Sequence, residues 1–368
     1  MGLYRSVIKP ILFNINIERA HSLALILLRI SKKLPFAKSI IRSSYSVEHP
    51  SLERLVFGRR FKNPIGVAPG FDINGEVIGE LENIGFGFVE IGAITPEQQS
   101  GNPKPRVFRL KKDNAIIHRL GQPNKGLYSA INNLRKNNGE VMVGCNIARN
   151  SNTLHTNASK EYLKSFRNLY QYVDYFTLSI NYDHLVTNEE TTVAMALEQL
   201  VSPLFDFRRG QTEYRPIMIK ISADMSDEMI DTVTDVMIAT PLDGIVAIDG
   251  TTSRPQNLNT TERNVASIGT GRLSGEPIRE RALEVVKRVH HRSGGAYPII
   301  GVGGIMNGED AKAMLEAGAS LVQVMTGFIY GGPGFAGQIC KELIVKEEVE
   351  TPEKTNTENE SSDSNDRG

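Results

Sequence analysis

The stretch Pro298-Ile-Ile-Gly-Val-Gly-Gly304 joins a short β-branched apolar run to a turn that contains two glycines. A polar segment of helical period follows, and then a second apolar run, Leu321-Val-Gln-Val-Met-Thr326, leads into Gly327. Near-continuous apolar strands that alternate with helices are typical of a parallel sheet with both faces covered. The stretch therefore predicts a parallel β/α architecture.

The same alternation extends back through most of the chain. Six earlier apolar runs have similar length and composition, at 64–70, 87–94, 141–147, 175–181, 216–222 and 244–249. The polar segments of helical period are clearest at 74–83, 227–238, 308–317 and 335–345. Eight strand–helix units in one domain are expected to close into a (β/α)8 TIM barrel, an α/β fold. An open doubly wound sheet is the alternative, which eight repeats and the lack of an early Gly-x-Gly-x-x-Gly disfavour.

Two connections are long enough to cover one end of this barrel. The first, 95–124, holds Arg106-Val-Phe-Arg-Leu110 and Ala115-Ile-Ile-His118, separated by a polar turn. That pattern predicts a hairpin inserted over the barrel mouth. The second connection is 250–276, after the sixth strand. Long loops at the carboxyl ends of barrel strands are where functional sites lie.

Composition excludes several classes of protein. Lys+Arg and Asp+Glu both number 42 in the 368 residues, so the charge balance favours no nucleic-acid partner. Cys145 and Cys340 form neither a disulfide framework nor a C-x-x-C pair, which favours a reducing cytoplasm. No apolar run approaches the roughly 20 residues of a transmembrane helix. No secretory signal peptide is expected at the start.

The two ends differ from the barrel segment 46–345. Residues 1–45 contain eight Lys/Arg and one acid, Glu18, interleaved with Ile, Leu and Phe. That pattern predicts two short basic amphipathic helices, suited either to an anionic membrane surface or to packing on the domain. Residues 346–368 are polar and acidic without apolar periodicity, and they predict a disordered tail.

The glycine turns after the last two strands predict a phosphate site. Successive backbone N–H groups at Gly303, Gly304 and Gly327 can approach an anion closely, although glycines can also serve only to turn tight loops. Lys220 ends another strand and would either stabilise negative charge on a bound ring or pair with an acid. Asn146 would either bond a ring edge or order its own loop.

A third group of polar residues lies in Ser179-Ile-Asn-Tyr-Asp-His184, after the fourth strand. His184 or Asp183 could act as a general base, and Tyr182 could do so only if its pKa of about 10 were depressed. The alternative is a solvated polar loop. No metal site is expected, because the histidines have no ligand-like spacing.

Over roughly residues 1–340 the chain resembles the class 2 dihydroorotate dehydrogenases, which are quinone-dependent and membrane-associated. The strings that carry the resemblance are Phe61-Lys-Asn-Pro-Ile-Gly66, Gly85-Phe-Gly-Phe-Val-Glu-Ile-Gly92, Gly101-Asn-Pro-Lys-Pro-Arg-Val-Phe-Arg-Leu110, Leu273-Ser-Gly275, Gly301-Val-Gly-Gly-Ile305 and Thr326-Gly-Phe-Ile-Tyr330.

The resemblance implies an FMN flavoprotein of pyrimidine biosynthesis. In this family FMN takes a hydride from C6 of dihydroorotate, a serine removes the C5 proton, and a membrane quinone accepts the electrons. Residues 1–45 would then form the helical domain through which the quinone enters, on the inner face of a membrane. The positions that the resemblance assigns to FMN are Gly70, Asn146, Ser179, Lys220, Gly275, Gly303, Gly304, Met325, Thr326 and Gly327.

Several matched positions depart from the family pattern. Ile73 replaces a lysine, Ala93 and Ile248 replace threonines, and Ser179 replaces an asparagine. The substrate positions are His118, Arg119, Gly121, Gln122, Asp249 and Gly250.

The reacting positions depart from the pattern as well. Tyr182 stands at the catalytic serine position, and His184, which could substitute as base, replaces an asparagine. Asp249-Gly250 replaces an Asn-Thr pair, and Asp249 is expected to repel the substrate carboxylate. A non-catalytic or repurposed relative that keeps the phosphate site is therefore an alternative, and a phosphosugar isomerase or aldolase is a third possibility.

Overall fold

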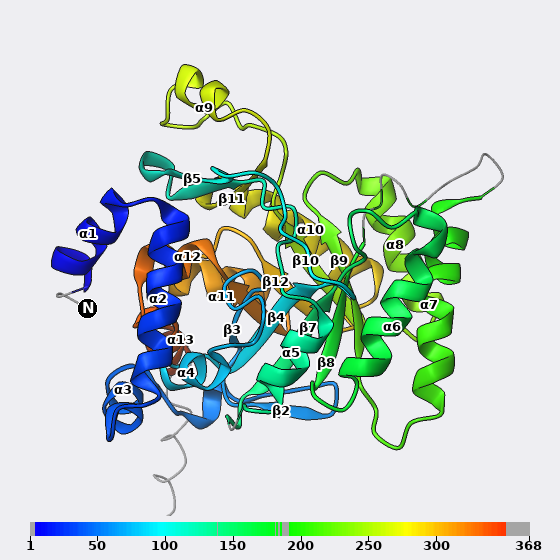
Figure 1. Cartoon of the computed structure of the whole chain (residues 1–368), viewed down its shortest axis with the longest axis horizontal. Coiled ribbons are helices and arrows are strands. Elements are labelled where there is room, and N and C mark those ends of the chain that lie inside the picture. The colour runs from blue at the N-terminus through cyan, green and yellow to red at the C-terminus, as the bar shows by residue number, and fades with distance from the viewer. Residues whose placement is uncertain (1–3, 138, 181, 183–184, 186–190, 351–368) are drawn as a thin grey trace, which may run out of the picture.

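The structure is a computed structural model that describes residues 4–137, 139–180, 182, 185 and 191–350 (Figure 1). Eight strands form a closed barrel in the order β3-β4-β7-β8-β9-β10-β12-β13, and all neighbouring pairs are parallel. The strands are β3 (Ile65–Val67), β4 (Phe88–Ile94), β7 (Met142–Ile147), β8 (Tyr175–Ser179), β9 (Ile217–Ser222), β10 (Gly244–Asp249), β12 (Ile299–Val302) and β13 (Leu321–Val324). The predicted barrel is confirmed, and each predicted apolar run contains one of these strands.

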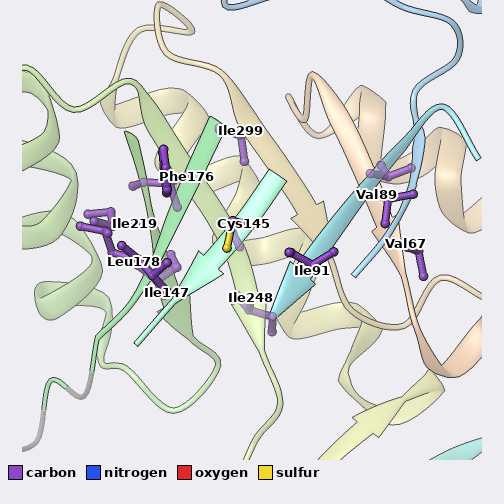
Figure 2. Close-up of a cluster of buried hydrophobic side chains, with 14 of the residues drawn as sticks. Val67, Val89, Ile91, Cys145, Ile147, Phe176, Leu178, Ile219, Ile248 and Ile299 are labelled. Atoms are coloured by element: carbon purple, nitrogen blue, oxygen red, sulfur yellow. The ribbon is translucent and has the colours of Figure 1, made fainter. Parts of the chain in front are cut away.

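Helices cover the outside of the barrel because every second strand residue is apolar and points outward. Figure 2 shows such side chains, among them Ile91, Cys145, Phe176 and Ile219, which belong to one buried cluster. The helices that follow the strands are α4 (Ile78–Asn83), α5 (Leu127–Leu134), α6 (Ala158–Leu169), α7 (Val193–Arg209), α8 (Asp227–Ala239), α10 (Arg279–Arg292), α11 (Gly308–Glu316), α12 (Thr326–Gly331) and α13 (Phe335–Glu350).

The barrel interior is apolar at its amino-terminal end and polar toward its mouth. Phe88, Tyr175 and Met218 pack there with Phe61 of the small hairpin β1 (Arg54–Val56) and β2 (Arg59–Phe61). Side chains two residues apart on a strand point to the same face. Two residues after these apolar side chains, the barrel interior therefore holds polar ones, including Glu90, Thr177, Lys220 and Gln323. Glu90 accepts hydrogen bonds from Asn146 Nδ2 (3.3 Å), Tyr175 Oη (3.0 Å) and Gln323 Nε2 (2.7 Å). The polar layer therefore forms the floor of the mouth.

A separate antiparallel sheet lies near the barrel mouth. β5 (Val107–Leu110) and β6 (Ala115–His118) form the expected hairpin, with Val107 opposite His118. A third strand, β11 (Arg272–Gly275), follows the short helix α9 (Glu262–Ile268) and pairs with β6 so that Arg272 lies opposite His118. β11 was not predicted from the sequence. This strand joins the two long connections, 95–124 and 250–276, into one sheet.

The described part of the amino-terminal extension, residues 4–45, contains three α-helices instead of the two expected. They are α1 (Lys9–Asn14), α2 (Ile17–Ser31) and α3 (Ala37–Tyr45), after a π-helical turn at Tyr4–Ile8. Figure 1 shows α2 along one side of the barrel, next to α12. Ile17 packs with Ile116 and Tyr330, and His21 Nε2 lies 2.7 Å from the carbonyl oxygen of Phe71. Within the described residues no helix has both the length and the apolarity to cross a membrane.

The last helix of the structure extends further toward the carboxyl end of the chain than the sequence predicted. α13 continues to Glu350, so residues 346–350 of the segment predicted to be a disordered tail are helical. Residues 351–368 lie outside the described part of the chain.

Candidate active site

Three glycine segments from distant parts of the chain meet at the carboxyl ends of β12 and β13. A Cβ on Gly327 would overlap the carbonyl oxygen of Ile305, so the start of α12 touches the turn after β12. A Cβ on Gly275 would lie 2.9 Å from Thr326 Cγ2, and Ser274 Oγ lies 2.9 Å from Thr326 Oγ1. The end of β11 therefore closes the same corner.

Side-chain atoms are excluded from this corner by geometry. Gly303, Gly304 and Gly275 have φ of 121°, 74° and 104°, a region that favours glycine. A Cβ on Gly304 would also overlap Cα and Cβ of Arg279 at the start of α10. The backbone is consequently the surface that a ligand meets here.

The mouth beside this corner contains buried polar atoms without partners. Asn146 Oδ1, Thr177 Oγ1 and Gln323 Oε1 make no hydrogen bond to any residue that the structure describes. Buried polar groups are almost always paired, so each of these exceptions requires an explanation. Lys220 lies on the same interior side, since Met218 two residues earlier points inward, and it pairs in register with Ser179. Gly70 lies at the same mouth, where its Cβ would come within 2.9 Å of Met325 Cε.

On the other side of the mouth the predicted substrate positions surround Arg272. Its Nη1 donates to the carbonyl oxygen of Gly250 (2.9 Å) and to Ser222 Oγ (3.2 Å), and its Nε lies 4.0 Å from Asp249 Oδ2. Burial acts to raise the pKa of Asp249, but the charges of Lys220, Arg272 and His118 outweigh it and hold that pKa below its usual value. Asp249 is therefore an ionised group flanked by cations, and this weakens the repulsion of a carboxylate that was expected from the sequence.

His118 is the strand partner of Arg272 and has a buried Nδ1 without a partner in the described part of the chain. Burial is the main effect that lowers the pKa of His118. The positive charges of Arg272 and Lys220 lower this pKa further, whereas the negative charge of Asp249 raises it. The lowered pKa leaves the imidazole neutral near pH 7, so Lys220 and Arg272 are the cations that flank Asp249 at that pH.

Tyr182 occupies an apolar environment. Its hydroxyl is buried and has no hydrogen bond to a described residue. The partly buried side chain packs against the main core cluster. Burial, with a smaller contribution from Tyr162, raises the pKa of Tyr182 far above the usual value. A phenol that keeps its proton cannot act as a base near neutral pH. His184, the expected substitute, and Asp183 lie outside the described residues.

The remaining predicted substrate residues organise the hairpin. Arg119 Nη1 donates to the carbonyl oxygens of Ile268 (2.5 Å) and Thr270 (2.8 Å), which ties β6 to the loop after α9. Gly121 and Gln122 form a turn with φ of 67° and 52°, held by Gln99 Nε2. Arg272 was not predicted, because a single arginine before Leu273-Ser-Gly carries no signal until β11 is placed on β6.

The comparisons with known proteins agree with this architecture. The sequence profile of the family described as dihydroorotate dehydrogenase matches residues 51–346. The dihydroorotate dehydrogenase (quinone) of Christiangramia forsetii is 39% identical over 94% of this chain and 99% of its own length, and that of Vibrio atlanticus is 37% identical over 90% and 97%. The crystal structure of ligand-free DHODH from Eimeria tenella has a TM-score of 0.79 at 30% identity, covering 90% of this chain and 95% of that one. The chain therefore belongs to the quinone-dependent class of the dihydroorotate dehydrogenase family.

Proposed function

We propose that the protein is an FMN-dependent dihydroorotate dehydrogenase that passes its electrons to a quinone. The observation that carries the proposal is the meeting of the segments around Gly275, Gly303 and Gly327 beside a mouth that holds unpaired buried polar atoms. A phosphorylated ring fits both features, because its phosphate can take the backbone amides and its ring edge can pair the buried atoms.

The residues present fit FMN on both sides of that molecule. The phosphate would lie against the backbone of Gly275, Gly303, Gly304 and Gly327, with the Thr326 hydroxyl next to it. The ring would lie at the mouth, where Gly70 and Met325 adjoin and where Asn146, Ser179 and Lys220 point inward. Bound FMN supplies the hydride acceptor that no amino-acid side chain can provide. Lys220 would then stabilise the additional negative charge of a reduced ring.

Departures from the family pattern remove some contacts without removing the site. Ile73, Ala93 and Ile248 supply no lysine or hydroxyl to the ring. Thr177 does point inward, two residues before Ser179, and its hydroxyl is among the unpaired buried atoms. A hydroxyl in this position offers the ring edge a hydrogen bond that the other substitutions withdraw.

Oxidation of dihydroorotate to orotate removes a hydride from C6 and a proton from C5, so the protein must supply a base for the proton. The environment of Tyr182 is unsuited to that task. His184 follows two residues later and remains the predicted base. An imidazole with an ordinary pKa is half-deprotonated near pH 6.5, so it accepts a proton readily at neutral pH.

The amino-terminal extension supports a peripheral membrane contact. Most of the exposed large apolar side chains of the described residues belong to it: Val7, Ile8, Ile11, Ile15, Leu23, Ile26, Leu27, Ile30, Leu34, Phe36 and Ile40. Its other face packs on Ile116 and on Tyr330 of α12, the helix that begins at Thr326. A quinone that entered between the amino-terminal extension and α12 would therefore arrive beside the proposed FMN site. We place the protein on the cytoplasmic face of a membrane, where its basic residues meet anionic lipid.

Absorbance of the purified protein tests the proposal first, since bound FMN gives a yellow protein with a flavin spectrum. Addition of dihydroorotate should then reduce the flavin, bleach a dye or quinone acceptor, and yield orotate. Colourless protein that takes up no added FMN would refute the flavoprotein function. A yellow protein that dihydroorotate does not reduce would instead be a non-catalytic or repurposed relative.

The membrane contact has a separate test with vesicles. The protein should co-sediment with vesicles that contain anionic phospholipid and less with neutral ones. Phe36→Asp places a charge where the side chain is 81% exposed, and it should weaken that binding without changing flavin content. Equal binding of the variant would count against this face.

A further inference from the structure

We propose that Arg272 binds the carboxylate of the ring substrate and thereby makes the site specific for an acid. The inference rests on the proposed function and adds a residue that the resemblance does not assign. It also accounts for the substitution of Asp249 and Gly250 at positions that would otherwise bind that carboxylate.

Arg272 lies where three of the predicted substrate positions meet. His118 is its cross-strand partner, Gly250 accepts a hydrogen bond from its Nη1, and Asp249 lies beside its Nε. A strand pairing, a hydrogen bond and a charge contact therefore join Arg272 to each of them. A substrate that contacts those positions must also come within reach of the guanidinium.

The guanidinium is oriented but not saturated. Nη1 is held by Gly250 and Ser222, whereas Nη2 makes no hydrogen bond within the described part of the chain. The separation of 4.0 Å between Nε and Asp249 is too long for a hydrogen bond. With 38% of its side chain accessible, Arg272 can offer the Nε–Nη2 edge to a ligand. That edge matches the two oxygens of a carboxylate.

The nearby acids orient Arg272 without occupying it. Asp224 Oδ2 lies 3.8 Å from Nη1 and already accepts hydrogen bonds from the backbone and hydroxyl of Thr252, both at 2.9 Å, while Thr251 bonds its other oxygen. Lys220 contributes a second positive charge to the field at Asp249. A bound carboxylate would thus meet two cations, one of them with free donors.

Gly250 makes room for this arrangement. A Cβ at position 250 would lie 2.8 Å from the carbonyl oxygen of Leu273 and 3.2 Å from Arg272 Cβ, closer than β11 allows without moving. A threonine there would therefore displace β11 and the arginine that it carries. The missing side chain at position 250 and the guanidinium of Arg272 therefore fit together: the guanidinium offers charge-assisted donors where a threonine would offer a neutral one.

Orotate binding to the FMN-loaded protein tests the assignment. Binding is measured by the change that orotate causes in the flavin spectrum. Arg272→Ala should weaken orotate binding by about 10- to 100-fold, because a charge-assisted hydrogen bond is lost. Uracil is the matched ligand without a carboxylate, and its binding should not change. Arg272→Lys should restore part of the orotate affinity. Asp249→Asn should strengthen orotate binding, since it removes the competing negative charge.

Two controls separate a local effect from a general one. Arg263→Ala removes an exposed arginine of α9, near the same hairpin, and should leave both ligands unaffected. Unchanged FMN content and thermal melting should show that Arg272→Ala and Arg272→Lys are folded. If Arg272 only neutralised Asp249, the double change Arg272→Ala with Asp249→Asn would regain full orotate affinity, and that result would overturn the assignment.

The outcomes also separate this inference from the proposed function. Turnover of dihydroorotate by the parent protein with equal orotate affinity in Arg272→Ala would refute the assignment and leave the function intact. A parent protein that holds FMN but binds no orotate would refute both. Protein that takes up no FMN would refute the function, and orotate binding measured by calorimetry would still decide the role of Arg272.

Discussion

Replacement of Gly304 by alanine should disturb folding and cofactor binding together. Gly304 has φ of +74°, and its added Cβ would overlap Cα and Cβ of Arg279 and lie 2.8 Å from Arg279 N. These are inner atoms at the start of α10, where Arg279 also pairs with Asp310 at 2.8 Å, so the side chain cannot simply rotate away. The turn after β12 or the amino end of α10 must therefore move.

The expected loss in the free energy of unfolding of Gly304→Ala has two separate contributions. A left-handed conformation costs a residue with a Cβ about 1–2 kcal/mol, and forcing extra atoms into a packed site costs about 1–3 kcal/mol. Together they predict a loss of about 2–5 kcal/mol in the free energy of unfolding. Movement of the turn should also weaken FMN binding by tenfold or more, as each 1.4 kcal/mol of binding energy changes affinity about tenfold.

Gly294→Ala is the matched control for this experiment. Gly294 has φ of +62°, but a Cβ added to it would meet no atom within 4 Å, so only the conformational term applies. Urea unfolding should place Gly294→Ala about 1–2 kcal/mol below the parent protein. Its FMN affinity, measured by quenching of flavin fluorescence on addition to flavin-free protein, should be unchanged. If Gly304→Ala unfolded like Gly294→Ala and bound FMN normally, the crowded corner would not be the phosphate site.

Three further predictions concern the mouth and the amino-terminal extension. Lys220→Ala should slow reduction of the flavin by dihydroorotate by about 100-fold in a stopped-flow measurement, because a positive charge next to the reduced ring is lost, and an unaltered rate would remove Lys220 from this role. Tyr182→Phe deletes a buried hydroxyl without a described partner and should leave turnover nearly unchanged, whereas His184→Gln should slow it by about 100-fold or more; the reverse ranking would restore Tyr182 as the base. Burial holds the pKa of His21 below its usual value, although the Phe71 carbonyl and Glu18 oppose this. The chain with α2 undocked therefore binds more protons than the docked chain. Docking of α2 should weaken as the pH falls through about 6.5, the usual pKa of histidine. Hydrogen exchange of α2 at pH 7.5 and 5.5, corrected for the intrinsic rate, should show this loosening in the parent protein and not in His21→Gln, and equal protection at both values would contradict it.

Elements with strong local patterns were predictable from the chain. All eight barrel strands fell within the apolar runs, because a strand buried on both faces needs apolar residues at nearly every position. The hairpin of β5 and β6 was predictable for the same kind of reason, since two apolar runs flank a polar turn.

Element ends were less predictable than the elements themselves. The extension divides into α2 and α3 around Leu34-Pro35, where proline interrupts a helix. α13 enters the polar tail because Lys and Glu at 346–348 favour a helix even without an apolar face. Hydrophobic periodicity alone cannot detect either effect.

The amino-acid sequence by itself determined the eight β/α units, the glycine turns and the family, because each is written in short-range patterns of size, polarity and backbone freedom. Only the tertiary structure decided that β11 pairs with β6, that Arg272 thereby meets Asp249 and Gly250, and that the Tyr182 hydroxyl is sealed from water. Contacts between residues far apart in the chain depend on how the barrel closes. The charge state of a side chain in turn depends on the burial and the neighbours that this closure creates.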